Sequence, residues 1–434
     1  MVTRTKTVFN VKEFPNVKAR LYAWATNDTP MAWYDSNEYP HQKCSYDAVL
    51  AVQSQSDIIA TEKLAQAIGT DWLFGFFSYE FAQTWEQVTP TNPRHISAPK
   101  LQFFCPKKIW LLKGDTLTAL YLNEADAQKD FDQILATQPL VSTESTPIDL
   151  VPGISKQEYI KRATALQQHI FRGDIYEINY CMEWFAKAVS VHPAQLFSRL
   201  NNIAKTPFAA YFHLNNIHLM CASPERFLMR EGTTVMSQPI KGTAARHEDV
   251  VLDAAAAQHL KNDAKERAEN IMITDLVRND LSRVAKKGSV AVVEQCAVYP
   301  FAQVHQMIST IVAQCDANIP SLAVIDACFP MGSMTGAPKQ RAMELIDSYE
   351  VSQRGLYSGA VGYFTPHGDF DFNVVIRSLI YDAQNQYLST HVGSAITAAS
   401  DVEKEYEECQ LKAAAIKGVL TNKRKKPLGH GTKV

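Results

Sequence analysis

Residues 357–392 read YSGAVGYFTPHGDFDFNVVIRSLIYDAQNQYLSTHV and contain three strand-like runs, at 359–364, 372–381 and 387–392. Aromatic and β-branched side chains, which strands favour, are frequent in them. No segment of helical length separates one run from the next, so the stretch lacks the regular strand–helix–strand rhythm of a parallel sheet. This pattern predicts an α+β fold and argues against a doubly wound parallel sheet.

The rest of the chain mixes strands and helices in the same irregular way. The aromatic run Trp72–Tyr79 predicts a buried strand, and Gly114-Asp115 predicts the turn of a hairpin between residues 108–112 and 116–121. Shorter strand-like runs cover His218–Cys221 and Thr233–Ser237. We expect a helix N-capped by Ser155 to reach Phe171, and further helices over Val251–Val284, Lys339–Tyr349 and Ser400–Leu420.

The composition is that of an ordinary globular protein. Of the 434 residues, 46% are hydrophobic and 20% charged, which argues against disorder, collagen and coiled coil. The 43 basic and 45 acidic residues leave a net charge of −2, so nucleic acid is not an expected partner. No apolar run reaches the ~18–20 residues of a membrane span, and the N-terminus lacks a signal-peptide pattern. The eight cysteines form no Cys-x-x-Cys pair, so we expect a soluble cytoplasmic chain with reduced cysteines.

A candidate linker divides the chain. Residues 137–153, TQPLVSTESTPIDLVPG, are rich in Pro, Ser and Thr. They separate an N-terminal region, residues 1–136, from a larger region, residues 154–420, that carries every motif described below. Residues 421–434 are basic and contain Gly and Pro, which is typical of a solvated, disordered end.

The segment FPMGSMTGAPK, residues 329–339, has the chemistry of an anion-binding turn. It places Gly332, Ser333, Thr335 and Gly336 just before a helix, where backbone N–H groups and hydroxyls suit a carboxylate or phosphate. It is not a Walker A loop, because the G-x-x-x-x-G-K-[ST] spacing is absent. Turn chemistry alone is equally compatible with a purely structural turn.

Two basic residues occupy strand-like segments. Lys241, in Gln238-Pro-Ile-Lys-Gly-Thr243, is either a desolvated nucleophile or, as composition alone favours, a surface lysine. Arg377 lies within the apolar run Phe372–Ile380 and needs a partner, because an unpaired buried charge is costly. That partner is either a substrate carboxylate or an internal Asp or Glu.

Two pairs of glutamates share a spacing. Glu266 and Glu269 lie three residues apart on one predicted helix, and Glu405 and Glu408 repeat the spacing on another, so each pair shares a helix face. Two such helices can hold a hard divalent cation through carboxylate oxygens. Spacing alone nevertheless favours the plainer interpretation, in which each pair is a solvated face.

From about residue 155 to 420 the chain resembles the chorismate-utilising enzymes, which include aminodeoxychorismate, anthranilate, isochorismate and salicylate synthases. The motifs follow the family order, and together they are far more specific than any one of them. The resemblance implies two orthogonally packed antiparallel β-sheets flanked by helices, with the N-terminal part packed against the same sandwich. The matching motifs are Gly173-Asp-Ile-Tyr176, Ser223-Pro-Glu-Arg-Phe227, Pro239-Ile-Lys-Gly-Thr243, Glu266-Arg-Ala-Glu269, Asp275-Leu-Val-Arg-Asn-Asp280, Gly332-Ser-Met-Thr-Gly-Ala-Pro-Lys339, Tyr357-Ser-Gly-Ala-Val-Gly-Tyr363, Ile376-Arg-Ser378 and Glu405-Tyr-Glu-Glu408.

Position 241 distinguishes branches of that family. Aminodeoxychorismate synthases typically read P-I-K-G-T there and anthranilate synthases P-I-A-G-T, and this chain has Lys241. No segment resembles the tryptophan-sensing L-L-E-S element of anthranilate synthases. The resemblance therefore implies aminodeoxychorismate synthase component I. Anthranilate synthase component I or a dual-purpose subunit stays open, and an isochorismate synthase or an inactive chorismate-binding module is less favoured.

The resemblance also implies a reaction, in which chorismate and ammonia give 4-amino-4-deoxychorismate for 4-aminobenzoate and folate synthesis. Lys241 is the implied nucleophile, which requires its pKa to fall, and Glu225 the implied general acid, which requires a raised pKa. A Mg²⁺ ion on the ring carboxylate is implied to be held by Glu269 and Glu408, with Glu266 and Glu405 direct or water-linked. The implied substrate-binding residues are Gly242, Thr243, Gln306, Gly332, Ser333, Thr335, Tyr357, Arg377 and Gly393.

Three positions depart from the family pattern. Gln306 stands where a histidine is frequent, and because an amide cannot relay a proton we expect it only as a substrate contact. Glu177 replaces the glutamine of the usual I-Y-Q and is not the lysine that activates water in isochorismate synthases. Ala395 stands in a turn that is usually Gly-rich. No glutaminase motif is present, so the resemblance implies a separate glutamine amidotransferase subunit as the ammonia source.

Overall fold

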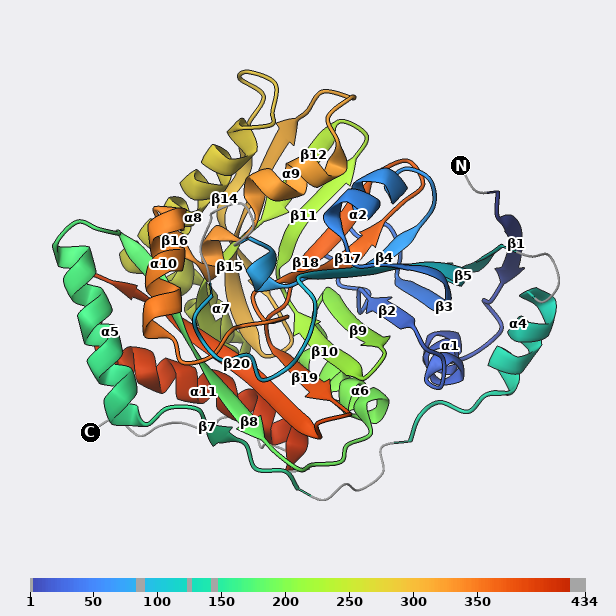
Figure 1. Ribbon diagram of the computed structural model, residues 1–434, viewed down its shortest axis with the longest axis horizontal. Coiled ribbons are helices and arrows are strands. Elements are labelled where there is room, and N and C mark those ends of the chain that lie inside the picture. The colour runs from blue at the N-terminus through green and yellow to red at the C-terminus, as the bar shows by residue number, and fades with distance from the viewer. Residues whose placement is uncertain (1–2, 83–89, 123–126, 142–146, 422–434) are drawn as a thin grey trace.

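The strands of the chain join into one antiparallel network. The computed structural model describes residues 3–82, 90–122, 127–141 and 147–421 (Figure 1). Twenty strands are connected within this part of the chain, and each of their pairings is antiparallel. The predicted α+β class is confirmed.

One long run of paired strands forms the first sheet. Its members are β1 (Thr5–Asn10), β2 (Met31–Asp35), β3 (Ala48–Ile58), β5 (Leu101–Lys113), β6 (Thr116–Tyr121), β7 (Val151–Pro152), β8 (Glu177–Ala186), β9 (Phe208–Leu214), β10 (Ile217–Ser223), β16 (Gly336–Ala337), β19 (Ser378–Asp382) and β20 (Tyr387–Thr397). Their hydrogen-bonded order is β8-β20-β19-β10-β9-β2-β3-β5-β6-β1, and the short β7 and β16 also pair with β8. The hairpin expected at residues 108–121 is the β5–β6 pair.

The second sheet carries four of the residues expected in the site, with Lys241, Gly242 and Thr243 on one strand and Gln306 on its neighbour. Its members are β4 (Leu73–Phe77), β11 (Arg226–Glu231), β12 (Thr234–Gln238), β13 (Ile240–Ala245), β14 (Ala291–Pro300), β15 (Val304–Gln314), β17 (Ala360–Phe364) and β18 (Phe370–Val374). They run in the order β4-β17-β18-β11-β12-β15, and β13 and β14 also pair with β15. Because β4 pairs with both β5 and β17, the two sheets are continuous at that point.

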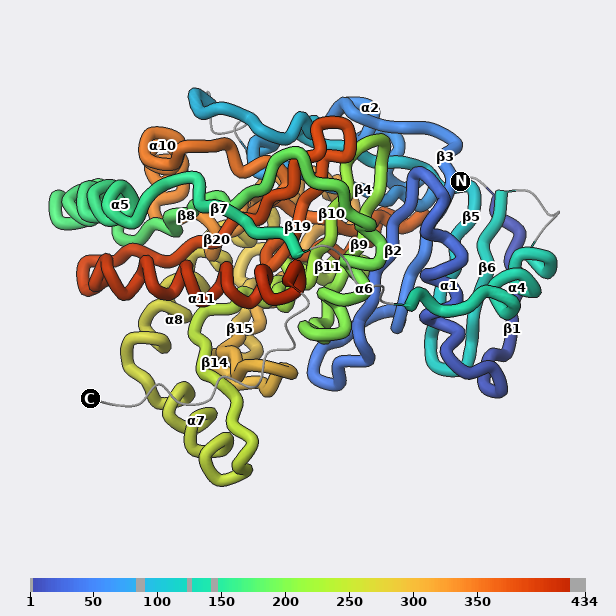
Figure 2. The backbone as a smooth tube through the Cα atoms, turned by 90° about the horizontal axis from the view of Figure 1, so that it is seen from below, coloured from blue at the N-terminus to red at the C-terminus, as the bar shows by residue number. Residues whose placement is uncertain are grey.

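Helices flank this network, and none that the structure describes is long and apolar enough to cross a membrane. They are α1 (Val17–Ala25), α2 (Thr61–Ala67), α4 (Ala127–Ala136), α5 (Lys156–Phe171), α6 (Pro193–Ala204), α7 (Val250–Asn262), α8 (Ala264–Ser282), α9 (Ser321–Cys328), α10 (Lys339–Tyr349) and α11 (Val402–Leu420), with 3₁₀ turns η1 (Tyr79–Phe81) and η2 (Gly332–Met334). The predicted cap is present, since Ser155 Oγ accepts from the Glu158 N–H at 3.2 Å. Figure 2 shows α7 projecting from the body of the molecule near α8.

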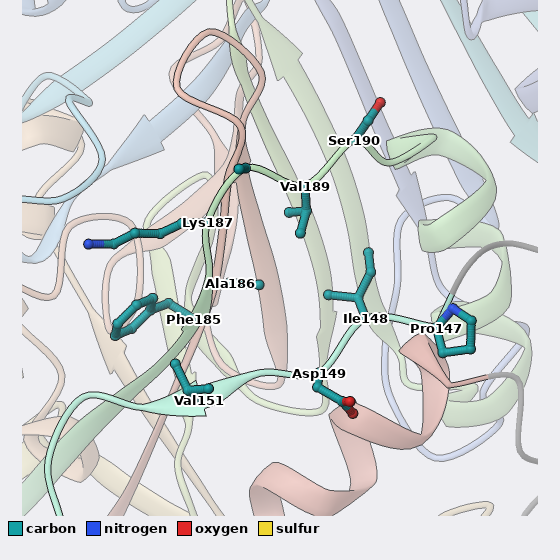
Figure 3. Close-up of a pocket in the computed structure, with 10 residues that line it drawn as sticks. Pro147, Ile148, Asp149, Val151, Phe185, Ala186, Lys187, Val189 and Ser190 are labelled. Atoms are coloured by element: carbon teal, nitrogen blue, oxygen red, sulfur yellow. The ribbon is translucent and has the colours of Figure 1, made fainter.

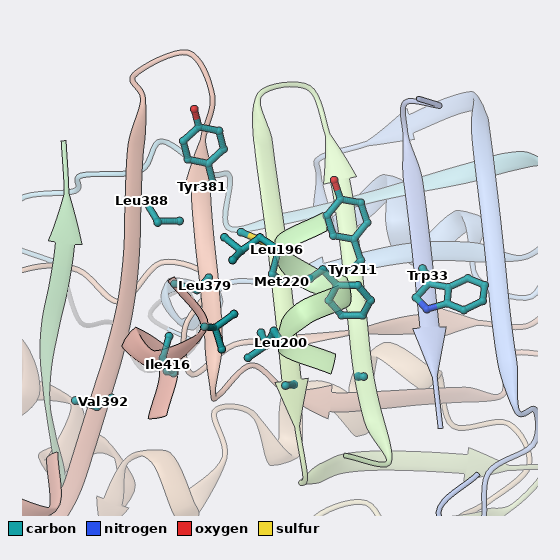
Figure 4. Close-up of a cluster of buried hydrophobic side chains, with 14 of the residues drawn as sticks. Trp33, Leu196, Leu200, Tyr211, Met220, Leu379, Tyr381, Leu388, Val392 and Ile416 are labelled. Atoms are coloured by element: carbon teal, nitrogen blue, oxygen red, sulfur yellow. The ribbon is translucent and has the colours of Figure 1, made fainter. Parts of the chain in front are cut away.

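Two apolar cores hold the layers together. One lies between the sheets and joins Phe74 and Phe103 of β4 and β5 to Phe212, Leu219 and Phe372 of β9, β10 and β18. The other lies between the first sheet and the helices α1, α5, α6 and α11. Figure 4 shows part of this second core, in which side chains of neighbouring strands meet those of α6 and α11: Trp33, Tyr211, Met220, Leu379 and Val392 with Leu196, Leu200 and Ile416.

The N-terminal region is built into the same sheets as the rest. β2 pairs with β9, and β4 pairs with β17, so strands from before residue 136 lie between strands from after residue 154. Within the expected linker, β7 pairs with β8, and residues 142–146 lie outside the described residues, as does the tail from 422 to 434. The precise domain boundaries stay a prediction.

Two predicted elements are each wrong in one respect. The helix expected over Val251–Val284 is two helices, because Asp263 adopts an extended conformation and its side chain accepts from the Glu266 N–H at 2.9 Å. Asp263 thereby caps α8 and ends α7. The strand expected over Phe372–Tyr381 is also interrupted, because Arg377 has a φ of 51°, a left-handed conformation that cannot continue a strand.

Candidate active site

Lys241 meets a buried carboxylate from a distant part of the chain. It lies on β13, and its Nζ donates to Glu177 Oε1 at 2.7 Å. Glu177 begins β8, where its backbone pairs with Ala337 of β16 and Thr397 of β20, and it is only 1% exposed. The side chain of Lys241 is 14% exposed, so it is not the surface lysine that composition favours.

The charges around Lys241 favour its ammonium form. Burial alone would lower the pKa of Lys241, but the negative charges of Glu177, Glu269 and Glu408 outweigh burial, and the pKa of Lys241 is raised. The fall in this pKa that the implied mechanism requires would need a nearby cation, and it stays a prediction. A cation that neutralised Glu269 and Glu408 would remove part of the effect that raises it.

Glu225 has the properties expected of a general acid. It is 4% exposed and lies between β10 and β11, where Ser333 Oγ donates to its Oε1 at 2.7 Å. Burial raises the pKa of Glu225 to about 7, although the hydrogen bond from Ser333 and the charges of Lys241 and Arg377 act in the opposite direction. The expected direction of this pKa shift is confirmed.

Arg377 differs from Lys241 and Glu225 in its lack of a hydrogen-bonded partner among the described residues. Its half-buried guanidinium makes no hydrogen bond or ion pair within the described parts of the chain. Burial lowers its pKa to about 10, and the charge of Glu225 acts against that effect. Of the two partners expected for this arginine, an internal carboxylate at bonding distance is thus absent from the described residues, and a substrate carboxylate stays a prediction.

The two predicted carboxylate pairs lie on neighbouring helices. Glu266 and Glu269 are on α8 and Glu405 is on α11, and Lys265 Nζ lies 3.8 Å from Glu269 Oε1 and 4.0 Å from Glu405 Oε1. Burial and the charges of nearby glutamates raise the pKa of all three carboxyls. The two helices therefore bring acidic groups together, and the side chains of Glu269 and Glu405 are largely buried, whereas half of the Glu408 side chain is exposed.

The fourth carboxylate, Glu408, is held by a lysine. Lys412 Nζ lies 2.7 Å from Glu408 Oε1, and although burial would raise the pKa of Glu408, the charge of Lys412 lowers it. Among the described residues, no three His, Cys, Asp or Glu side chains are spaced so as to hold a metal ion. Carboxylate oxygens that repel one another have the donor chemistry that Mg²⁺ prefers. The magnesium site therefore stays a prediction, and it requires these side chains to come closer together.

The expected anion-binding turn serves both the fold and the site. A Cβ on Gly332 would lie 2.5 Å from Leu276 Cδ2 of α8, so the turn packs closely against that helix. Thr335 is fully buried, and its hydroxyl donates to the Met331 oxygen at 2.9 Å, within the turn itself. Ser333, by contrast, directs its hydroxyl at Glu225. The turn shapes the environment of the acid, and its substrate contacts stay predictions.

Tyr357 and Gly393 meet at Cys181. The Tyr357 ring stacks on His391 with ring centroids 5.2 Å apart, and its hydroxyl lies 4.0 Å from Cys181 Sγ. Gly393 pairs with Cys181 in the β8–β20 ladder, and a Cβ on Gly393 would lie 2.5 Å from the same sulfur. No hydrogen bond in the described residues joins either of them to Arg377, so their shared grip on a substrate stays a prediction.

The remaining expected residues lie along β13 and β15. Gly242 has a φ of 101°, and a Cβ there would lie 3.1 Å from Glu266 Oε2, which places β13 against α8. Thr243 is exposed and pairs with Gln306, whose side-chain oxygen is buried without a partner in the described structure. His305, the neighbour of Gln306, instead binds Asp253 of α7, with Nε2 and Oδ1 2.9 Å apart.

Sequence reasoning did not place Glu177 in the site, although its departure from I-Y-Q was a usable signal. A surface pocket of about 610 Å³ lies elsewhere, between residues 147–151 and 185–190 (Figure 3). None of the expected site residues lines it.

The fold and the site together define a class of protein. It is an α+β enzyme in which a lysine, a carboxylic acid and an unpartnered arginine are gathered beside a cluster of glutamates. The chain belongs to the chorismate binding enzyme family, whose sequence model matches residues 18–418.

Individual relatives agree with this assignment. The chain is 34% identical to aminodeoxychorismate synthase component 1 of Escherichia coli (strain K12) over 338 residues, 77% of this chain and 73% of that protein. It is 40% identical over 265 residues to aminodeoxychorismate synthase of Streptomyces griseus, 60% of this chain and 36% of that protein. The resemblance to aminodeoxychorismate synthase component I is confirmed.

Solved structures share the fold. The menaquinone-specific isochorismate synthase MenF from Escherichia coli has a TM-score of 0.76 at 16% identity, covering 96% of this chain and 95% of that one. Anthranilate synthase component I from Streptococcus pneumoniae TIGR4 has a TM-score of 0.74 at 22% identity, covering 87% of this chain and 94% of that one. At these identities the likeness establishes the fold and not the reaction.

Proposed function

We propose that the chain is component I of an aminodeoxychorismate synthase, which converts chorismate and ammonia to 4-amino-4-deoxychorismate. The observation that carries this proposal is the grouping of Lys241 with Glu225 and Arg377. Their charges act on one another, Glu225 is near half-protonation at neutral pH, and Arg377 has no partner in the described chain. Chorismate offers carboxylates to a guanidinium and a hydroxyl that leaves once it is protonated.

Arg377 binds the enolpyruvyl carboxylate of chorismate in this proposal. A bidentate arginine–carboxylate pair supplies orientation as well as affinity. Tyr357 and the backbone N–H of Gly393 bind the same carboxylate. The free guanidinium supports this role, because a buried charge without a protein partner is otherwise costly.

The chemistry uses four proton transfers and one covalent intermediate. Lys241 first gives a proton to its nearest acceptor, Glu177, whose Oε1 lies 2.7 Å from Nζ. The free amine adds to C2 of the ring while Glu225 protonates the C4 hydroxyl, which leaves as water. Ammonia then adds at C4, the bond between C2 and the lysine nitrogen breaks, and Lys241 recovers its proton from Glu177. Glu225 regains a proton from the ammonium group that forms at C4, so the net change is loss of water and gain of the amine.

Magnesium is part of the proposal. Glu269 and Glu408 would hold the ion, with Glu266 and Glu405 direct or through water, and the bound ion would supply Lewis-acid polarisation of the ring carboxylate. The raised pKa of Glu266, Glu269 and Glu405 supports this role, since a nearby divalent charge would relieve their mutual repulsion. Ammonia would come from a separate glutamine amidotransferase subunit.

A product assay tests the proposed reaction. The chain is incubated with chorismate, Mg²⁺ and ammonium, with and without an added aminodeoxychorismate lyase. We expect 4-aminobenzoate only in the presence of the lyase. Fluorescent anthranilate formed without any lyase, and no 4-aminobenzoate with it, would contradict the proposal and identify an anthranilate synthase.

The nucleophile is tested by Lys241→Ala. We expect 4-amino-4-deoxychorismate formation to be lost or diverted to another product, with the thermal unfolding midpoint close to that of the wild type. Lys286→Ala is the matched control, because Lys286 is exposed and pairs only with Asp316 at the surface. Wild-type kinetics in Lys241→Ala would refute the assignment.

A further inference from the structure

A single buried amide joins the helix that carries two of the glutamates to the peptide of Lys241. Asn270 follows Glu269 on α8 and is 2% exposed. Its Nδ2 donates to the backbone oxygen of Lys241 at 3.1 Å and to that of Met307 at 3.2 Å. Met307 lies on β15, the strand that pairs with β13, so the amide bridges one helix and two strands.

The other end of this amide is fixed as well. Asn270 Oδ1 accepts from Ser309 Oγ at 2.5 Å, and Ser309 Oγ accepts in turn from the Cys296 N–H at 3.0 Å. Cys296 has a positive φ of 54°, at an irregular place in β14. Every polar group of Asn270 is therefore used, and its orientation leaves no alternative rotamer with the same bonds.

The ladder between β13 and β15 does not hold Lys241 itself. Its register shifts between Ile240 and Thr243, so Lys241 and Gly242 lie in the irregular part, and Gly242 has a φ of 101°. At the end of the Lys241 side chain, Nζ donates a hydrogen bond to Glu177. The backbone oxygen of Lys241 is bonded to Asn270, at the place where a regular strand would have a ladder hydrogen bond.

We propose that Asn270 is a positioning residue for Lys241. Its hydrogen bond to the Lys241 backbone fixes the position of the lysine relative to α8 and to the glutamates on that helix. This inference rests on the proposed function, in which Lys241 attacks the substrate. An attacking atom that is misplaced by about 1 Å costs about 10²-fold in rate. Asn270 contacts neither Arg377 nor Tyr357 through any hydrogen bond that the structure describes, so substrate affinity should not depend on it.

The test is Asn270→Asp, which keeps the shape of the side chain and removes both donors. We expect kcat to fall about 10²-fold while the KM for chorismate changes by less than about threefold. In a Lys241→Ala background the same substitution should leave the residual conversion of chorismate unchanged, because it would act only through the missing lysine. Asn279→Asp is the control on the same helix, since Asn279 is exposed, and it should keep the wild-type kcat.

Ser309→Ala is the milder variant, should Asn270→Asp fail to fold. It frees Asn270 Oδ1, and we expect a loss in kcat of about fivefold to tenfold at unchanged KM. A wild-type kcat in either folded variant overturns the inference. An equal loss of kcat from Asn270→Asp with and without Lys241 also overturns it, since Asn270 would then act on the fold in general.

If Lys241→Ala shows no turnover, calorimetric titration with chorismate decides. An unchanged chorismate affinity in Asn270→Asp supports positioning, and a loss of affinity above about tenfold overturns it. The proposed function fails separately, when the wild-type chain forms no 4-amino-4-deoxychorismate.

Discussion

Arg354, which is buried, and Arg377, which is half-buried, are two arginines in opposite situations. Arg354, between α10 and β17, bonds Glu350 through Nε at 3.0 Å and Nη2 at 2.5 Å, and donates to the backbone oxygens of Met334 and Asn179 at 2.6 and 2.8 Å. Its guanidinium also lies over the ring of Tyr79, 4.6 Å from the centroid. Arg377, between β18 and β19, has no such bond within the described residues.

The difference separates a structural charge from a binding charge. A buried cation with a full set of partners ties together the elements that supply them, here the loop after α10, the η2 turn and β8. A buried cation without partners costs stability and persists where an anion completes it. Arg354 should therefore matter to unfolding and Arg377 to substrate, and four experiments test that division.

The largest effect is expected from Arg354→Met. It leaves the buried carboxylate of Glu350 unpaired, which typically costs about 3–5 kcal/mol of the free energy of unfolding. Urea or thermal unfolding measures this loss directly. A variant as stable as the wild type would show that Glu350 finds another partner or takes up a proton. Arg354 would then not be needed for stability, and its contrast with Arg377 would fail on that point.

Arg377→Met is expected to do the reverse. The free energy of unfolding should stay the same or rise, because an unpaired buried charge is removed. Loss of a charge-assisted bidentate pair should lower kcat/KM for chorismate about 10²-fold. Arg377→Lys keeps the charge without the bidentate geometry and should fall between. Steady-state kinetics and unfolding are measured on the same preparations, and a destabilised Arg377→Met with normal kinetics contradicts the division.

Local signals made most of the fold predictable. The Gly114-Asp115 turn, the Ser155 cap and the bounds of α10 follow from residues next to one another in the sequence. The break at Asp263 was missed because an aspartate in an Ala-rich, charged run is equally compatible with a continuous helix. Only the packing of α8 against β13 and β15 distinguishes the two. Arg377 likewise interrupts a run, residues 372–380, that is mostly apolar.

The residues of the site were predictable from motifs, but their partners were not. Lys241 and Glu177 are 64 positions apart, and Ser333 and Glu225 are 108 apart, so each contact depends on how distant strands and turns pack. The charge state of Lys241 could not be predicted for a related reason. It depends on the sum of three carboxylates from β8, α8 and α11, which outweighs the burial that a strand position suggests.

The third experiment compares the carboxyl groups beside the two arginines through pH. Burial raises the pKa of Glu350, but it bonds Arg354 directly, whereas burial raises the pKa of Glu225 to about 7 and only a charge acts between it and Arg377. Glu225 must donate a proton, and Lys241 is protonated at rest throughout this pH range because its pKa is raised. We therefore expect kcat/KM to fall about tenfold from pH 7.5 to 8.5, with an apparent pKa near 7.

The sign for stability follows from the same shift. Folded Glu225 holds a proton that the unfolded chain releases between its ordinary pKa of 4.5 and about 7, so its contribution to stability declines as pH rises through that range. A pH–rate profile of the wild type and of Glu225→Gln measures the predicted fall of kcat/KM above pH 7. This fall should be absent from the profile of the amide variant, and a fall that persists there would assign the titration to another group.

The smallest effect is expected from Glu177→Gln, which tests an intermediate case. Lys241 is a partly buried cation like the two arginines, but it has a single bonded carboxylate, at 2.7 Å. Removing that charge should lower the pKa of Lys241, because burial would then be opposed by Glu269 and Glu408 without Glu177. More free amine at pH 8 should accelerate reductive methylation of Lys241 by up to about tenfold, measured by peptide mass spectrometry.

Glu183→Gln is the matched control for this last comparison. Glu183 lies on the same strand and is also buried, but it bonds His95 and Tyr387, so the labelling of Lys241 should stay at the wild-type rate. Equal labelling in all three proteins would mean that Glu177 does not hold the lysine's proton. A faster labelling of Lys241 in Glu177→Gln alone would make Lys241 an intermediate case between the fully paired Arg354 and the unpaired Arg377. One carboxylate would then keep Lys241 charged at rest, and the same carboxylate could take its proton when substrate arrives.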